Sequence, residues 1–201
     1  MKRMVLLFLL ALALPMAAFA NNSFDITNAG GTLSGSSAGL TLSGSTLIAF
    51  GSGGMPITGN LGSVGFSTAA LLTGDLQQGG TFDAGGSFLI TGNGTNGVFN
   101  GTIFTGTFTG PVTWTLVTLA NGTHNYTLSG ALNGTWYTGA SVVGATIQIT
   151  INTGKGFFNG STSISSGDTN ISMVVPEPGS LTLLGTGLVG LAGVVRRKLK
   201  A

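Results

Sequence analysis

The sequence predicts an all-β fold, an antiparallel β-sandwich of the jelly-roll type, between two end segments of different composition. Apolar and polar residues alternate with a period of two in several stretches, and no amphipathic pattern of helical length lies between the ends. Six Asn-Gly dipeptides suit the turns of β-hairpins. Similar short segments at 80–88, 101–108 and 126–132 keep a β-solenoid as the alternative, although they lack the fixed period that a solenoid requires.

The clearest alternation begins at Phe104. Its even positions form an apolar face and are Phe104, Gly106, Phe108, Gly110, Val112, Trp114 and Leu116. The odd positions carry Thr, with one Pro, so we expect a half-buried strand or strand pair with a hydroxyl-bearing outer face. The pattern recurs over 126–136 and 145–151, and glycines on the core face allow close packing and tight curvature.

The Asn121-Gly122 dipeptide predicts the best-defined hairpin, with strands over 111–119 and 124–132. We expect a type I′ turn, because both residues tolerate a positive φ. Two further strands are predicted, over 46–50 and around 81–83, where two Gly-Gly pairs bracket a short segment. The rest of the Gly- and Ser-rich first part predicts either edge strands or partial disorder.

Residues 1–20 have the three regions of a secretory signal peptide. Lys2 and Arg3 precede an apolar stretch, and Ala18 and Ala20 form a small-x-small cleavage site before Asn21. We therefore expect export through the Sec translocon and cleavage by signal peptidase between Ala20 and Asn21. An uncleaved signal anchor is the alternative, which the short apolar stretch disfavours.

Residues 176–201 predict a second membrane-directed segment. An uncharged, mostly apolar stretch over 179–195 is about long enough for a short transmembrane helix. A basic cluster follows it and consists of Arg196, Arg197, Lys198 and Lys200. Basic residues beside a span stay in the cytoplasm, so the precursor would be held in the inner membrane with its main domain on the opposite side.

The order of features at this end resembles the PEP-CTERM sorting signal. Pro176, Glu177 and Pro178 precede the Gly- and Leu-rich span, and Arg-Arg-Lys follows it. The resemblance implies an exported protein of a Gram-negative, exopolysaccharide-producing bacterium, which a membrane-embedded exosortase processes near the motif. Because the exosortase uses a cysteine and this chain has none, the resemblance implies the substrate rather than the sorting enzyme. A plain C-terminal anchor is the alternative interpretation.

The predicted mature domain, residues 21–175, contains 155 of the 201 residues and is long enough for one sizeable core. It has one basic residue, Lys155, and four aspartates, so its formal charge is −3 although the whole chain has a pI of about 9.3. Nucleic acid is therefore not an expected partner. The absence of Cys excludes a disulfide framework, a thiol nucleophile and Cys-ligated zinc.

Few residues in the domain suit acid–base chemistry, so we expect no enzyme, no cofactor and no metal. His124 could be a general base or a metal ligand, but its position after a turn favours a solvated hairpin residue. Asp75, Asp83 and Asp168 could pair as in glycosidases or bind Ca²⁺. Their isolation in sequence instead favours surface or turn carboxylates, and Asp83 and Asp168 adjoin turn-forming residues.

Parity separates the large aromatic residues into two groups. Trp114, Tyr126 and Trp136 share the apolar face and are predicted to lie in the core, whereas Tyr137 is predicted to lie on the surface. Tyr137 is thus the candidate for stacking on a sugar ring. The sequence favours a non-enzymatic protein of the cell surface or exopolysaccharide matrix, with a secreted polysaccharide-binding module or glycan hydrolase as the alternative.

Overall fold

Alternating side chains build an almost continuous series of strands in the computed structural model, which describes residues 21–52 and 55–174. Thirteen strands and one 3₁₀ turn lie in this part of the chain, and no α-helix occurs there. The strands are β1 (Asn21–Ala29), β2 (Thr32–Ser36), β3 (Gly39–Ser52), β4 (Ile57–Ser67), β5 (Leu71–Asp75), β6 (Gly79–Phe82), β7 (Gly85–Asn93), β8 (Asn100–Phe108), β9 (Val112–Thr118), β10 (His124–Trp136), β11 (Ser141–Asn152), β12 (Ser161–Ser163) and β13 (Ser166–Val174), and the turn is η2 (Thr95–Gly97).

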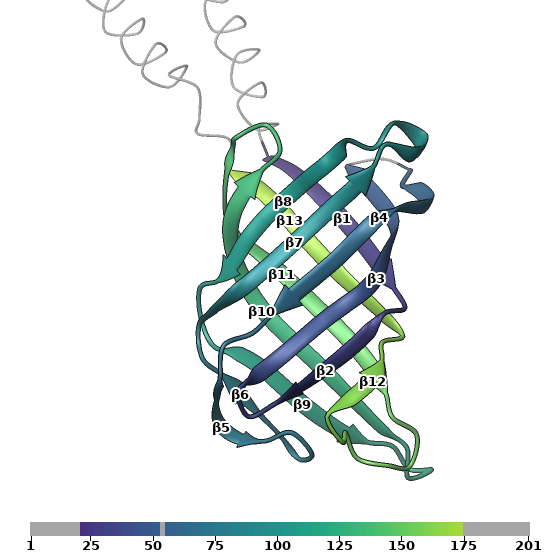
Figure 1. Ribbon diagram of the computed structural model, residues 1–201, viewed down its shortest axis with the longest axis vertical. Helices are drawn as coiled ribbons and strands as arrows, with labels where there is room; N and C mark the ends of the chain where they lie inside the picture. Colours follow the sequence, from purple (N-terminus) through teal and green to yellow (C-terminus); the bar gives the residue numbers. More distant parts are fainter. Residues whose placement is uncertain (1–20, 53–54, 175–201) are drawn as a thin grey trace, which may run out of the picture. The chain divides into compact units, whose positions relative to one another are not determined.

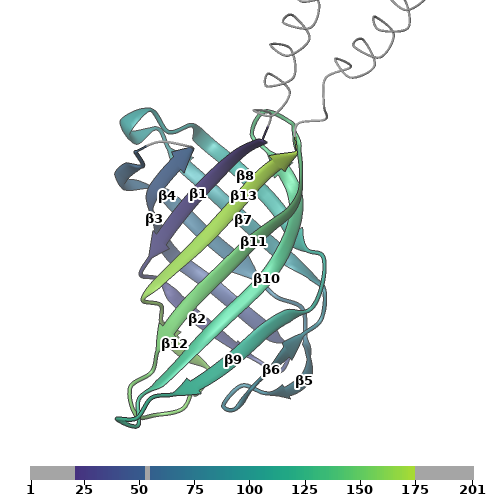
Figure 2. The same cartoon turned by 180° about the vertical axis from the view of Figure 1, so that it is seen from behind.

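Eight of these strands close into an antiparallel barrel. Their order is β1-β3-β4-β7-β8-β10-β11-β13, and β13 pairs with β1 to complete the ring. Figure 1 shows β3, β4, β7 and β8 side by side on one face, and Figure 2 shows β1, β13, β11 and β10 on the opposite face. The antiparallel all-β class is therefore confirmed, whereas the sandwich and the solenoid are replaced by a closed barrel.

Glycines on the inner face explain part of this difference. Gly106 of β8 lies directly across from Gly134 of β10. A Cβ on Gly134 would overlap the carbonyl oxygen of Thr105 and lie 2.7 Å from the Gly106 Cα. The two strands can approach this closely only without side chains, which permits the sharp coiling that a small barrel needs.

Shorter strands extend the sheet at one end of the barrel. The series β9-β6-β5 continues from β10, and β2 and β12 continue from β3. The backbone N–H of Leu71 in β5 donates a hydrogen bond of 2.8 Å to the carbonyl of Ser37, which lies between β2 and β3. The two extensions are therefore joined at this end.

The predicted hairpin is confirmed, but its turn type is wrong. Strands β9 and β10 pair antiparallel, with Trp114 across from Leu128. Gly122 has a φ of 78°, whereas Asn121 does not adopt a positive φ, so the type I′ turn does not form. The N–H of Gly122 instead bonds to the carbonyl of Leu119 at 2.9 Å, within a longer five-residue connection.

The other local predictions also hold in the main. The segment 46–50 lies within β3, and the short Gly-bracketed strand is β6. The Gly- and Ser-rich first part, of which the structure omits only residues 53–54, forms β1, β2, β3 and most of β4. The predicted signal peptide over 1–20 and the predicted transmembrane helix over 179–195 lie outside the described residues.

Large apolar side chains fill the barrel, as the parity of the sequence predicts. Buried residues from the alternating stretch include Phe104, Phe108, Val112 and Trp114. Aromatic contacts recur along the interior and comprise Phe24, Phe50 and Trp136, then Phe66, Phe88, Phe104 and Phe108, then Trp114, Tyr126 and Phe158. An eight-stranded barrel has an interior just wide enough for such side chains to fill.

Candidate functional site

Two exposed aromatic rings form a stacked pair at the junction of β8 and β10. Tyr137 directly follows β10 and Phe99 directly precedes β8. Their ring centroids are 4.8 Å apart with an interplanar angle of 21°, and the residues are 48% and 46% exposed. This pair is called the aromatic ledge below. Its position confirms Tyr137 as a surface residue next to the buried Trp136.

Backbone hydrogen bonding and the packing of a neighbouring residue hold the chain segments that carry the two rings. The N–H of Tyr137 donates a hydrogen bond of 2.8 Å to the carbonyl of Ile103. Phe99 follows Val98, which is only 4% exposed and anchors the connection between β7 and β8. A Cβ on Gly101 would lie 3.2 Å from the Phe99 ring, so glycine at that position leaves room for the ring.

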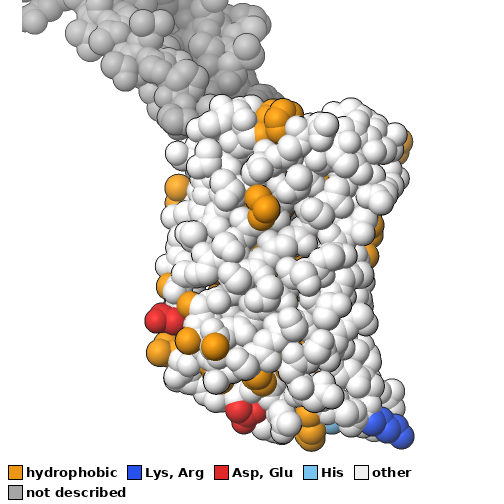
Figure 3. All heavy atoms as spheres, viewed as in Figure 1, with side chains coloured by type: hydrophobic (Ala, Val, Ile, Leu, Met, Phe, Trp, Pro, Cys, Tyr) orange, Lys and Arg blue, Asp and Glu red, His pale blue; other side chains and the backbone are white. Residues whose placement is uncertain are grey.

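The exposed strand residues closest to the ledge in sequence are polar and uncharged. Asn100 and Thr102 are exposed on β8 within three residues of Phe99, Thr135 is exposed on β10 two residues before Tyr137, and Thr105 lies across from Thr135. Every charged side chain of the described residues lies elsewhere, and these are Asp25, Asp75, Asp83, Lys155 and Asp168. Figure 3 shows one face of the barrel, on which most of the surface is white and the charged side chains lie towards the lower end.

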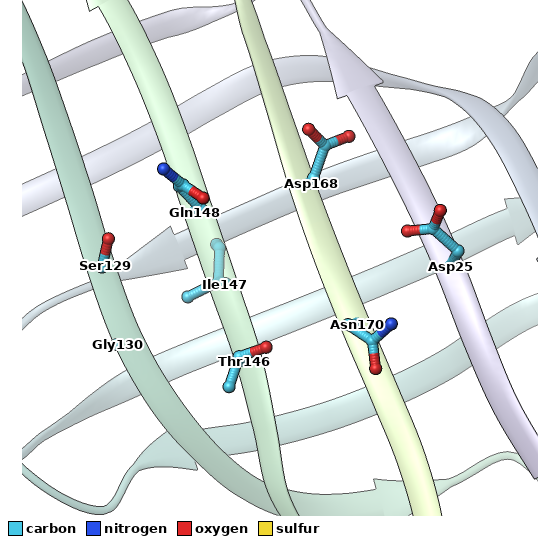
Figure 4. Close-up of a pocket in the computed structure, with 8 residues that line it drawn as sticks. All are labelled: Asp25, Ser129, Gly130, Thr146, Ile147, Gln148, Asp168 and Asn170. Atoms are coloured by element: carbon cyan, nitrogen blue, oxygen red, sulfur yellow. The ribbon is translucent and has the colours of Figure 1, made fainter.

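A separate open groove crosses the outer face of β10, β11, β13 and β1, with a volume of about 430 Å³. Figure 4 shows Asp168 and Asp25 on neighbouring strands, with Gln148 beside Asp168. The register places Gln148 directly across from Asp168 and Thr146 across from Asn170. Sequence reasoning missed Asp25 as a neighbour of Asp168, because the pairing of the first and last barrel strands leaves no local pattern.

The three carboxylates singled out from the sequence do not converge. Asp75 accepts hydrogen bonds from the N–H groups of Gln77 and Gln78 at 2.7 and 2.6 Å, in the turn between β5 and β6. Asp83 lies at the other end of that hairpin and accepts a 2.8 Å bond from the Ala84 N–H, so its turn assignment is confirmed. The turn assignment of Asp168 is wrong, since it lies within β13.

His124 is not the solvated residue that its place after a turn predicts. It is 8% exposed and its ring stacks on Phe157, with centroids 4.2 Å apart. The backbone N–H of His124 donates a hydrogen bond of 2.7 Å to the carbonyl of Gly154, so the connection between β11 and β12 folds over this residue. The His124 Nδ1 is buried and has no hydrogen-bond partner among the described residues.

Metal-ligating residues do not gather in groups of three or more within residues 21–52 and 55–174. In those same residues, none of the helical structure has the length and apolar character needed to cross a membrane. The predicted signal-peptidase residues Ala18 and Ala20, the sorting residues Pro176, Glu177 and Pro178, and the basic residues Arg196, Arg197, Lys198 and Lys200 lie outside the described part of the chain.

Comparison with known families identifies the C-terminal segment. Residues 174–198 match the family described as the PEP-CTERM protein-sorting motif. The matched residues include Pro176-Glu177-Pro178 and the basic residues up to Lys198. No curated protein and no solved structure matches the chain. The chain thus carries the PEP-CTERM sorting motif, which marks exported proteins that an exosortase processes.

Proposed function

We propose that this chain is the precursor of a non-enzymatic protein of the bacterial cell surface or exopolysaccharide matrix. The observation that carries the proposal is the sorting motif, whose match begins at Val174, the last residue of the barrel strand β13. The exported part would then be the barrel, and the remainder of the C-terminal segment would serve its delivery.

The interior of the barrel supports a structural role. Trp114, Tyr126 and Phe104 are at most 1% exposed and occupy space that wider barrels leave for a ligand. The outward positions of β8 carry Thr105 and Thr107, both exposed, so the outer face offers hydroxyl groups to water or to other polymers. The three aspartates that could pair as in glycosidases, Asp75, Asp83 and Asp168, do not lie together on either face. Their separation favours a non-enzymatic protein over a glycan hydrolase.

The proposed route has three steps. Signal peptidase removes residues 1–20 after export by the Sec translocon. The helix predicted over 179–195 then holds the precursor in the inner membrane, with its basic end in the cytoplasm. The exosortase processes the chain near Pro176-Glu177-Pro178, a sequence in which each proline disfavours helical backbone at the residue before it, and the barrel reaches the cell surface or matrix.

Replacement of Pro176-Glu177-Pro178 by three alanines tests this route. In cells that contain the exosortase, the substituted precursor should accumulate in the membrane fraction, while the unsubstituted protein appears outside the cell at lower mass. Immunoblots of both fractions give the measurement. Pro111→Ala, a substitution of an exposed proline before β9, is the matched control and should be processed normally. Normal release of the triple-alanine protein would contradict the proposal.

A polysaccharide-binding module is the second candidate function. The aromatic ledge favours it, because two half-exposed stacked rings on a neutral surface are suited to contact with a sugar ring. The two functions are compatible, since a matrix protein can be retained by binding the polymer around it.

A further inference from the structure

The ledge exposes two large aromatic side chains at the surface of the barrel. Phe99 and Tyr137 stack on each other, and nearly half of each remains exposed. Single exposed apolar residues are common in proteins, but two that are stacked and fixed together form a prepared contact surface. We propose that the aromatic ledge binds a neutral polysaccharide chain, with one sugar ring lying on the exposed aromatic surface.

The chemistry of the rings favours a sugar. The faces of aromatic rings carry partial negative charge, and they attract the polarised C–H groups on the flat side of a pyranose. Contact with an aromatic face therefore replaces water on the apolar side of the sugar while its hydroxyl groups remain free for hydrogen bonds. Asn100, Thr102 and Thr135 are exposed on the strands that carry the ledge, close to its rings in sequence, and would offer amide and hydroxyl partners for these groups.

The absence of nearby charge favours a neutral polymer over an acidic one. No charged residue occurs on β7, β8 or β10, or in η2. An anionic polymer would need basic side chains, and Lys155, the one basic residue of the described part, lies in the connection between β11 and β12. The proposal thus commits to neutral glycans and excludes nucleic acid and acidic polysaccharides as preferred ligands.

The ledge is also ordered before binding. Tyr137 is tied to Ile103 through its backbone, and Phe99 adjoins the buried Val98. Groups that are already fixed lose little conformational entropy when a ligand arrives, so weak stacking contributes more of its energy to affinity. Repeated contacts along a long polymer would then add retention through multivalency.

This inference deepens the proposed function. It rests on that proposal in one respect, namely that the barrel is delivered to the outside of the cell, where it encounters polysaccharide. The test is native affinity electrophoresis of the purified full-length protein in detergent. The gels contain the neutral exopolysaccharide fraction of the producing bacterium, galactomannan as a second neutral polymer, or alginate as an anionic polymer. Because uncleaved protein is used, failure to bind is distinguishable from failure of processing by the exosortase.

We expect both neutral polymers to retard the protein and alginate to leave its mobility unchanged. Tyr137→Ala and Phe99→Ala should each weaken binding about tenfold, at the lower end of the losses measured when a nucleic-acid base loses its aromatic stacking partner. Tyr137→Phe keeps the ring and should bind nearly as well. Phe157→Ala removes another exposed aromatic residue, 43% exposed and stacked on His124, and should have no effect.

Several outcomes would overturn the proposal. These are an absence of retardation by either neutral polymer, a stronger effect of alginate, or an equal loss of binding in Phe157→Ala and Tyr137→Ala. Size-exclusion chromatography tests for the other possible occupant of the aromatic ledge, which is a second copy of the chain. If the protein is a dimer that Tyr137→Ala converts to a monomer without changing polysaccharide binding, the ledge is a protein interface instead.

Discussion

The hydroxyl group of Tyr126 fastens two connections to the end of the barrel core, and its removal gives a sharp test of the packing. Tyr126 is fully buried, and its Oη donates a 2.7 Å hydrogen bond to the carbonyl of Gln77 between β5 and β6. The same oxygen accepts a 3.1 Å bond from the backbone N–H of Phe158, between β11 and β12. Tyr126→Phe deletes both bonds and retains the ring that stacks on Trp114.

The expected loss of stability depends on whether each former hydrogen-bond partner of the hydroxyl group can bond to water instead. The hydrogen bond to the Phe158 N–H is buried, and a buried donor without a partner costs about 1–3 kcal/mol. Gln77 is exposed, so its carbonyl can turn to water at little cost. We therefore expect Tyr126→Phe to lower the free energy of unfolding by about 2 kcal/mol. For a domain of this size, that corresponds to a decrease in Tm of about 4–8 °C.

Urea unfolding of the purified protein, followed by far-UV circular dichroism, measures this loss. The m-value should stay unchanged, since the substitution alters stability rather than the surface exposed on unfolding. Tyr137→Phe removes the hydroxyl of the exposed tyrosine and is the matched control, with an expected change within about 0.5 kcal/mol. If the two phenylalanine variants unfold at the same urea concentration, the Tyr126 hydroxyl does not fasten the barrel end as argued.

Two further predictions concern the free energy of unfolding and use the same urea assay. Gly134→Ala should destabilise the barrel by about 3 kcal/mol, because the added methyl group meets the backbone of β8, whereas Gly110→Ala, which meets open space, should be neutral. His124→Phe should leave stability unchanged or raise it by about 1 kcal/mol, since it replaces a buried nitrogen without a partner by carbon. A loss above 1 kcal/mol would mean that the Nδ1 has a partner in solution.

Local alternation allowed much of the barrel wall to be predicted. The inward or outward direction of a side chain follows from its parity within one strand, so the burial of Trp114 and Trp136 and the exposure of Tyr137 required no knowledge of neighbouring strands. Parity fails where a strand is irregular. Ile103 and Phe104 are consecutive and both buried, beside a register shift in the β7–β8 pairing.

The candidate sites could be predicted only in part, because they depend on pairings between distant strands. Tyr137 was evident as a surface aromatic residue, but its stacking on Phe99 depends on the pairing of β8 with β10 and on the connection that precedes β8. Asp25 and Asp168 face the same groove because β1 and β13 close the ring. Nothing in the residues near either aspartate indicates that closure.

The Asn-Gly dipeptides do not form the type I′ turns that they predict. A type I′ turn requires left-handed backbone at both residues, yet among the described non-glycine residues only Asn96 has a positive φ. Asn100 and Asn133 lie inside β8 and β10 rather than in turns. The dipeptide tolerates several local structures, and the length of the connection decides which one forms.

Glycine on the inner face favours a barrel over a sandwich. In a sandwich, two facing sheets lie about 10 Å apart, and a glycine on an inner face leaves a hole unless a long side chain reaches across. Here the ring of Phe104 lies over both Gly106 and Gly134, since a Cβ on either glycine would approach its ring atoms to 2.8 Å. Large and small inner residues thus complement each other within one sheet, without a facing sheet to fill the space above the glycines. Gly134, which belongs to an Asn-Gly dipeptide, therefore lies under an aromatic ring inside the barrel rather than in a turn.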